Sequence, residues 1–353
     1  MRFNCISKTF YTLIKSSTFV NLYLYRATTS KDEFILFKHC FEHERNRYKT
    51  ILSFLSGDDD DDDYFNPIIQ DLDVTHLKSN NNYSLDQFIG PCHGLIAMMD
   101  SVTTISINPS TRNYRLLPPD QVIGCQKDYY RSIQNVGFGY DSIANDYKVI
   151  RISIIYMTDH DDYPEEMDRI VDIYDLSVDC WRKLDSGVVQ QLSMFYCVSC
   201  SQMFYRGICH WVASQDIDGN IDEYTVLCFE MSTEIFHSLK IPEPCHLIYG
   251  PSCKLMVLHD SLALIYHPYS EPSWIKKYTI RGLQIDFPLA IWKGYLLLYQ
   301  SGSGCLMSYN LNSNVVKELS FHGVPQSFRV ICYKDSLTSI PRENEHTTQV
   351  HKF

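Results

Sequence analysis

The chain has 353 residues, of which 45% are hydrophobic and 13% aromatic, and its formal net charge is −11. This is enough for one large β domain with a short appendage, and no apolar run approaches the ~18–20 residues that a membrane span requires. The acidic balance argues against a nucleic-acid surface and favours a basic partner. The thirteen cysteines, an odd number, indicate free thiols in a cytoplasmic protein.

Residues 1–24 differ from the rest of the chain because their apolar residues recur at helical spacing. The pattern predicts a short helix or helix pair, and Ser16-Ser17 ends the run. From Phe19 the apolar residues alternate with others, which predicts a strand. Residues 34–37 and 51–55 are predicted to be two strands of a first blade, that is, of a first antiparallel sheet.

Two acidic segments interrupt the strand pattern. The run Asp58–Asp63 places six carboxylates side by side, and Thr158–Asp168 is a second acidic segment. Adjacent carboxylates repel one another and cannot be packed, so both are predicted to be exposed loops. A calcium site needs oxygen ligands spaced through a turn, often around a glycine, and the uninterrupted run lacks that spacing.

One sequence unit recurs along the chain. In 105–119, Ile105 and Ile107 alternate as in a strand, Asn108-Pro109-Ser110-Thr111 has turn chemistry, and Tyr114 resumes the strand. This predicts a β-hairpin. The same arrangement of polar, small and large apolar residues recurs at 175–184, 230–239 and 310–319. In these copies the large apolar residue is Trp181, Phe236 and Val316, and the last is the weakest match.

A second element precedes most of these hairpins. It is an apolar strand entered through a small or polar residue, and its instances begin at Gly94, Gly207, Ser261 and Gly294. A strand and a hairpin repeated about every 40–50 residues are typical of propeller blades. The alternative is a generic all-β protein whose hairpins share a composition. The fixed order of two different elements favours a mainly β, kelch-like propeller with six or seven blades, preceded by a short helical segment.

The motifs that could carry catalysis are weak. Gly137 and Gly139 alternate with apolar residues, as in a strand approached closely by another backbone, and no third glycine or helix follows to make a nucleotide loop. Cys197 and Cys200 form a C-x-x-C without a second cysteine pair or a knuckle turn, so strand packing is the favoured interpretation. No hydrolase, zinc-protease or phosphate-loop motif is present. We expect no catalytic residue, no metal and no cofactor.

The chain resembles a known family nearly from end to end. Residues 1–14 and Phe19 resemble the second half of a plant F-box, and 90–96 followed by 107–119 resembles the F-box-associated, kelch-like domain. Further matches are at 137–141, 146–149, 174–182 and 210–211. The sequence of 90–119 and 137–152 is most similar to the S-locus F-box proteins of pollen.

The resemblance implies a binding role and no catalytic activity. Members of this family are substrate receptors of cullin-based ubiquitin ligases, with a Skp-type adaptor bound to the F-box helices and a substrate held by the propeller. In the S-locus group the substrate is a basic, secreted pistil ribonuclease, recognised in the pollen tube cytosol. The first F-box helix, with its Leu-Pro start, is expected to be missing from this chain. The alternatives are a stand-alone propeller binding protein and, more remotely, a propeller enzyme.

These considerations divide the chain into a partial F-box (1–24), a kelch-like propeller (25–340) and a polar tail (341–353). Exposed loops are the expected substrate contacts, together with the segment 121–131. The residues that match the retained half of the F-box are Phe3, Cys5, Ile6, Leu13 and Ile14. The expected substrate-binding residues in the two acidic segments are Asp58, Asp60, Asp63, Asp159, Asp161 and Glu165.

Overall fold

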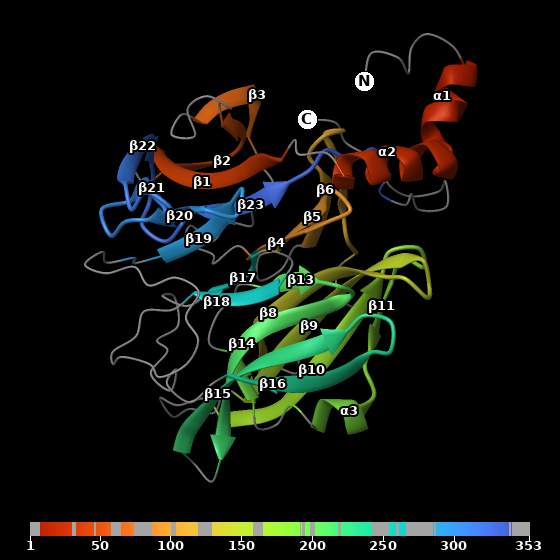
Figure 1. Ribbon diagram of the computed structural model, residues 1–353. Coiled ribbons are helices and arrows are strands. Elements are labelled where there is room, and N and C mark those ends of the chain that lie inside the picture. Colours follow the sequence, from red (N-terminus) through yellow and green to blue (C-terminus); the bar gives the residue numbers. More distant parts are fainter. Residues whose placement is uncertain are drawn as a thin grey trace.

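The computed structural model is a ring of antiparallel sheets with two helices at its N-terminal side (Figure 1). This confirms the predicted mainly β propeller. The structure describes residues 8–29, 33–45, 47–57, 65–73, 87–99, 104–118, 129–157, 165–190, 192, 195–197, 202–217, 220–241, 254–258, 261–265, 285, 287–338 and 340.

Within these residues the strands form six sheets, and the strands of each sheet are named from the inner one to the outer one. Blade I contains β23 (Arg329–Tyr333), β1 (Phe34–Glu44), β2 (Arg47–Gly57) and β3 (Phe65–Asp73). Blade II contains β4 (Gln87–Cys92), β5 (Leu95–Met99), β6 (Thr104–Asn108) and β7 (Asn113–Leu116). Blade III contains β8 (Tyr129–Asp141), β9 (Asp146–Met157), β10 (Glu165–Asp175) and β11 (Cys180–Lys183).

The other three sheets complete the ring. In blade IV, β12 (Phe195–Cys197) and β13 (Met203–Tyr205) both pair with β14 (Ile208–Ile217), and β15 (Asn220–Glu230) and β16 (Ile235–Lys240) follow. Sheet V contains β17 (Lys254–Leu258) and β18 (Ser261–Ile265). Blade VI contains β19 (Phe287–Trp292), β20 (Leu296–Gln300), β21 (Cys305–Asn310) and β22 (Val316–His322). The described residues therefore form five complete blades and one two-stranded sheet, where the sequence spacing predicts six or seven blades.

The core lies between the sheets. A cluster of buried apolar side chains joins each sheet to the next, and the last cluster joins sheet V to blade VI. Strands such as β5 and β20 are buried along their whole length because sheets cover both of their faces, which explains their continuous apolar sequences. The outer strand β22 alternates instead, with Leu319 buried between exposed neighbours.

The recurring sequence units are the hairpin turns of the blades. Turns of the 105–119 type span 108–113, 175–180, 230–235 and 310–315, and the segment 141–146 forms a fifth copy. The fifth residue of each turn has a positive φ between 53° and 60°. These residues are Arg112, Asn145, Asp179, Glu234 and Asn314. The other element begins at a two-residue turn that ends in Gly94, Gly207 or Gly294, each with positive φ, as tight hairpins between twisted strands require.

The ring closes by pairing the two ends of the propeller. β23 pairs antiparallel with β1, so strands from both ends of the chain share blade I. The segment after β23 then crosses onto blade II, where the Asn108 side-chain amide donates to the carbonyl oxygens of Ser336 (3.2 Å) and Thr338 (2.7 Å). The Tyr333 hydroxyl donates to the Gly94 carbonyl oxygen at 3.2 Å.

The propeller has two distinct faces. One face carries the hairpins that join the first strand of a blade to the second and the third to the fourth, and we call it the turn face. These hairpins include 93–94, 141–146 and 230–235. The opposite face carries the connections between second and third strands and between blades, and we call it the loop face. β1 is the second strand of blade I, so the chain enters blade I at the turn face.

The N-terminal segment is helical throughout its described part. α1 (Lys8–Lys15) and α2 (Ser17–Thr29) lie at the turn-face end of blade I (Figure 1). The strand predicted from Phe19 onward is therefore wrong. The Ser16 hydroxyl accepts a hydrogen bond from the Phe19 backbone N–H at 3.3 Å, which is a helix N-cap contact, so Ser16 ends one helix and begins the next. The third helix, α3 (Ser186–Gln190), is a single short turn beside blade III.

Candidate functional site

The two helices expose apolar side chains to solvent. Leu13 of α1 is 52% exposed, and Leu22 and Tyr25 of α2 are 63% and 71% exposed. Leu22 and Tyr25 are three residues apart and therefore share one helix face. Ile14 is half-buried. Of the residues expected to contact an adaptor, Leu13 is thus on the surface, whereas Phe3, Cys5 and Ile6 lie outside the described residues.

Helix α2 lies near the segment that follows β23. Burial, and next to it the negative charge of Asp335, raises the pKa of Tyr23. Glu33, just before β1, has a raised pKa because of burial, which the nearby Lys334 partly offsets. Phe34 at the start of β1 pairs with Tyr333 at the end of β23, so the chain entering blade I and the chain leaving it lie together at the turn face.

The two acidic segments leave the propeller at opposite faces. Gly57 of β2 pairs with Phe65 of β3 at the same end of blade I as Ile35, so the segment 58–64 connects two strands at the turn face. Met157 of β9 pairs with Glu165 of β10 at the end of blade III away from the 141–146 turn. Both ends of this connection therefore lie at the loop face.

This arrangement separates the predicted substrate-binding residues into two groups. Asp58, Asp60 and Asp63 fall in the first connection and Asp159 and Asp161 in the second, and all five lie outside the described residues. Glu165 begins β10. The connection that contains 121–128 also opens at the loop face, because Tyr129 pairs with Met157. Tyr129, Met157 and Glu165, which flank the connections 121–128 and 158–164, thus lie at one end of blade III, whereas Gly57 and Phe65, which flank 58–64, lie at the other face.

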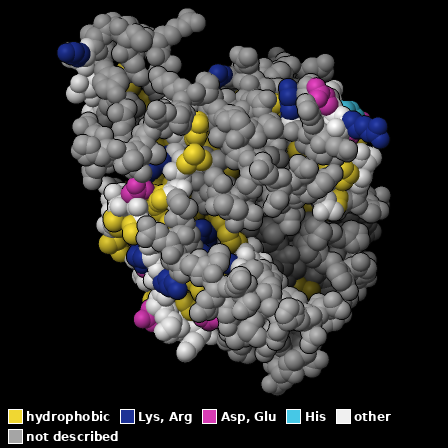
Figure 2. Space-filling model, turned by 180° about the vertical axis from the view of Figure 1, so that it is seen from behind, with side chains coloured by type: hydrophobic (Ala, Val, Ile, Leu, Met, Phe, Trp, Pro, Cys, Tyr) yellow, Lys and Arg dark blue, Asp and Glu magenta, His cyan; other side chains and the backbone are white. Residues whose placement is uncertain are grey.

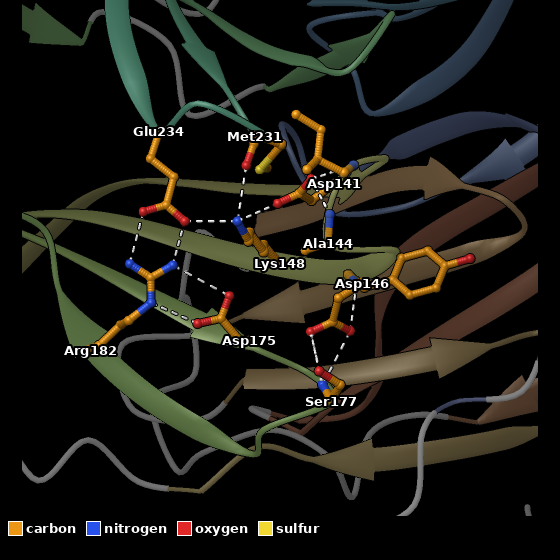
Figure 3. A network of polar contacts seen from close by, with 11 residues as sticks. Asp141, Ala144, Asp146, Lys148, Asp175, Ser177, Arg182, Met231 and Glu234 are labelled. Atoms are coloured by element: carbon orange, nitrogen blue, oxygen red, sulfur yellow. Dashed lines mark hydrogen bonds and ion pairs between the residues drawn. The ribbon is translucent and has the colours of Figure 1, made fainter.

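A polar network joins blades III and IV at the turn face (Figure 3). The Lys148 ammonium group on β9 lies 2.6 Å from Asp141 Oδ2 and 2.7 Å from Glu234 Oε1, and it also donates to the Met231 carbonyl oxygen at 3.1 Å. Arg182 on β11 extends the network, with its Nη1 2.8 Å from Glu234 Oε2 and its Nε 2.7 Å from Asp175 Oδ2.

The charges of this network are satisfied within the protein. Burial alone would raise the pKa of Asp141, but hydrogen bonds from Lys148 and the Ala144 backbone N–H outweigh it and lower the pKa to about 2. Burial likewise opposes the ionised form of Glu234, and hydrogen bonds from Arg182 and Lys148 hold its pKa below the usual range. Burial alone would lower the pKa of Lys148, but its hydrogen bonds to Asp141 and Glu234 outweigh burial and raise that pKa, so all three groups stay charged near neutral pH. The network therefore braces two blades with paired charges.

A second set of charges is buried inside blade III. Asp172 is fully buried and forms ion pairs with Arg131 and, at 3.7 Å, with Arg151. The Arg151 guanidinium also lies 3.6 Å from the centre of the Trp181 ring. These contacts hold the cations between strands, so this set too is structural.

The view from behind in Figure 2 shows acidic, basic and hydrophobic side chains interspersed over the described surface. No charge of one sign dominates the described part of that view. Among the described helices, none is long and apolar enough to cross a membrane.

Comparison with known proteins identifies the family. The model of the F-box associated beta propeller domain matches residues 60–281, which is more than half of the chain. The chain therefore belongs to the F-box associated beta propeller family. This match covers the outer strand β3 of blade I, blades II–IV and sheet V, and it agrees with the fold described above.

The curated relatives are F-box proteins of Arabidopsis thaliana. The F-box protein CPR1 is 26% identical over 69% of this chain and 56% of its own length. A putative F-box protein is 24% identical over 72% of this chain and 57% of its own length, and another F-box protein is 23% identical over 71% and 69%. The chain thus spans little more than half the length of the first two relatives. The N-terminal domain of Nup159 superimposes on 82% of the chain with a TM-score of 0.30 and 9% identity, which is too distant to bear on the assignment.

Proposed function

We propose that this chain is the substrate-recognition subunit of a Skp–cullin–F-box ubiquitin ligase and has no active site of its own. The observation that carries the proposal is the combination of an F-box associated propeller with a helical pair that exposes apolar side chains beside it. A rigid blade structure that holds loops at its faces is suited to binding a protein substrate.

The adaptor surface is assigned to the N-terminal helices. Exposed apolar side chains at the centre of a protein interface contribute most of its affinity, and Leu22 and Tyr25 present such a pair. The proposed adaptor surface also includes Leu13 and Ile14. In this proposal the F-box residues Phe3, Cys5 and Ile6 belong to the same surface. A cullin would be reached through the adaptor. The partition into residues 1–24, 25–340 and 341–353 is kept as part of the same proposal.

The substrate surface is assigned to the loop face. The helices occupy the turn face, so a substrate on the opposite face would not compete with the adaptor. The connections that contain 121–128 and 158–164 begin or end there, and the proposed contacts in and beside the second are Asp159, Asp161 and Glu165. Acidic loops would attract a basic substrate over a distance set by salt screening. Under the S-locus resemblance this substrate is a basic secreted ribonuclease, met in the cytosol of the pollen tube.

The test is co-purification with a plant Skp-type adaptor. The chain of 353 residues is compared with a version extended by the upstream half of an F-box. The proposal expects the adaptor to be retained by the extended version, and retention by both would show that the present helices suffice. If neither version retains the adaptor, the receptor role is contradicted and the alternative, a stand-alone propeller that binds a protein, is supported.

A further inference from the structure

We infer that blade VI carries a zinc-binding site formed by Cys305, Glu318 and His322, at the loop face. Cys305 is the first residue of β21, and Glu318 and His322 lie on β22. One ligand atom from each residue lies within 4.8 Å of the other two. The Cys305 Sγ and His322 Nδ1 atoms are 3.2 Å apart.

A β-bulge brings the three side chains together. Cys305 pairs with His322 and Met307 pairs with Glu318, so two residue steps of β21 lie opposite four steps of β22. In an unbulged ladder the steps would be equal, and Glu318 would lie farther from Cys305. The even-numbered residues 318–322 face solvent while Leu319 is buried, so the Glu318 and His322 side chains emerge on the same exposed side.

The backbone around the site is held by two glycines. Gly304 precedes Cys305, and Gly323 follows His322; the Gly323 N–H donates to the Gly304 carbonyl oxygen at 3.0 Å. A Cβ atom on Gly304, where φ is +87°, would lie 2.3 Å from the Gly323 carbonyl oxygen, so only glycine allows this approach. The Cys305 N–H also donates to the Ser301 hydroxyl at 3.2 Å. The positions of Cys305 and His322 are therefore fixed before any ligand binds.

The donor set points to zinc. Thiolate, imidazole and carboxylate are the ligands that Zn²⁺ takes in proteins, whereas calcium and magnesium prefer oxygen ligands alone. With Zn–S of about 2.3 Å and Zn–N of about 2.0–2.1 Å, a tetrahedral ion places sulfur and nitrogen about 3.6 Å apart. The observed 3.2 Å separation needs only a small adjustment. Three protein ligands leave the fourth position open to water or to a group of a bound partner.

The site shares the loop face with the acidic connection of blade III. β22 ends at His322, where the chain passes towards the first strand of blade I, and the Val324 N–H donates to the Cys40 carbonyl oxygen at 2.9 Å. A zinc ion at this position would add positive charge to one part of the face that the proposed function assigns to the substrate. The metal site itself does not depend on that assignment.

The experiment is a Co²⁺ titration of the full chain under reducing conditions after treatment with a chelator. Thiolate coordination to Co²⁺ gives a near-ultraviolet charge-transfer band, which Zn²⁺ should then abolish by displacement. Because the chain has thirteen cysteines, variants must assign the band. The test variants are Cys305→Ser, His322→Gln and Glu318→Gln, and Cys180→Ser, which changes an exposed cysteine of blade III, is the matched control.

The inference expects one equivalent of Co²⁺, loss of the band in Cys305→Ser and an unchanged band in Cys180→Ser. Removing His322 or Glu318 should weaken affinity by more than the about 10–100-fold that loss of an outer-shell partner costs. Zn²⁺ should also protect Cys305, but not Cys180, from alkylation. A Cys305→Ser variant that keeps the band, or a wild-type chain without one, would overturn the site. If Cys305→Ser does not fold, the surface variant Glu318→Gln decides, because the inference expects weakened Co²⁺ affinity in this variant and an unchanged affinity would overturn the site.

Discussion

The Lys148 Nζ atom lies 2.7 Å from the Glu234 Oε1 atom, and this contact joins the second strand of blade III to the outer turn of blade IV. Because Lys148 also neutralises the buried Asp141, its removal leaves an uncompensated carboxylate. We expect Lys148→Met to lower the free energy of unfolding by about 3–5 kcal/mol. The measurement is urea unfolding, with Lys183→Met on the exposed edge strand as the control. If the two variants lose the same free energy of unfolding, the network does not stabilise the contact between the blades.

The same network predicts how stability depends on acid. The pKa of Asp141 is about 2 in the folded chain against an ordinary value of 3.8, so the unfolded chain binds the proton more tightly. Its contribution is therefore complete above the ordinary pKa and disappears as the pH falls from about 4 to about 2, a loss of about 2 kcal/mol. Asp141→Asn should flatten this part of the stability profile. A variant with the same acid dependence as the wild type would contradict the assignment.

Packing between blades III and IV is tight enough to require glycine. A Cβ atom on Gly137 would lie 2.6 Å from the Ile150 side chain and 2.8 Å from the Trp211 ring. We expect Gly137→Ala to lower the free energy of unfolding by about 1–3 kcal/mol, because the added methyl group overpacks the interior. Gly187→Ala on α3 is the control, because its nearest neighbour is the end of the flexible Asp185 side chain. Thermal unfolding that leaves Gly137→Ala as stable as Gly187→Ala would refute this account.

The repeats allowed much of the fold to be predicted. A hairpin turn imposes local rules on residue type, such as a polar first residue and a positive φ at the fifth, and these rules are visible in 108–113 and its copies. The glycine at 137 was also readable as a close approach. Its partners are not readable in this way, since they are the side chains of Ile150 in the same blade and Trp211 in the next blade, and not another backbone.

The helix after Phe19 is not predictable from its local pattern. The apolar run contains both aliphatic and aromatic residues, so its alternation does not distinguish a strand from a helix, and the exposure of Leu22 and Tyr25 is not foreseen.

Features that depend on long-range topology are not predictable from the sequence either. Closure by β23 makes β1 the second strand of blade I, and this puts the flanking pairs Gly57–Phe65 and Met157–Glu165 at opposite faces. Cys305 and His322 are 17 residues apart and meet only through the bulge.

The opposite placement of the acidic connections gives a matched test of the substrate surface. A strand of 11 residues separates the faces by about 35 Å, and the Debye length at physiological salt is about 8 Å. Neutralising Asp159, Asp161 and Glu165 should slow association with a basic ribonuclease and weaken its salt dependence. Neutralising Asp58, Asp60 and Asp63 removes the same charge at the other face and should leave the association rate unchanged. Equal effects of the two triple variants would contradict a substrate site on the loop face.

The helices at the turn face are proposed to bind a Skp-type adaptor, and the most direct measurement is the affinity of the adaptor for surface variants of the extended chain. Leu22→Asp should lower this affinity by at least about 2 kcal/mol, since it places a charge in the apolar centre of the interface. Val178→Asp changes a side chain that is 70% exposed at a propeller turn and should have no effect. Unchanged binding by Leu22→Asp, in a chain that unfolds like the wild type, would contradict the account.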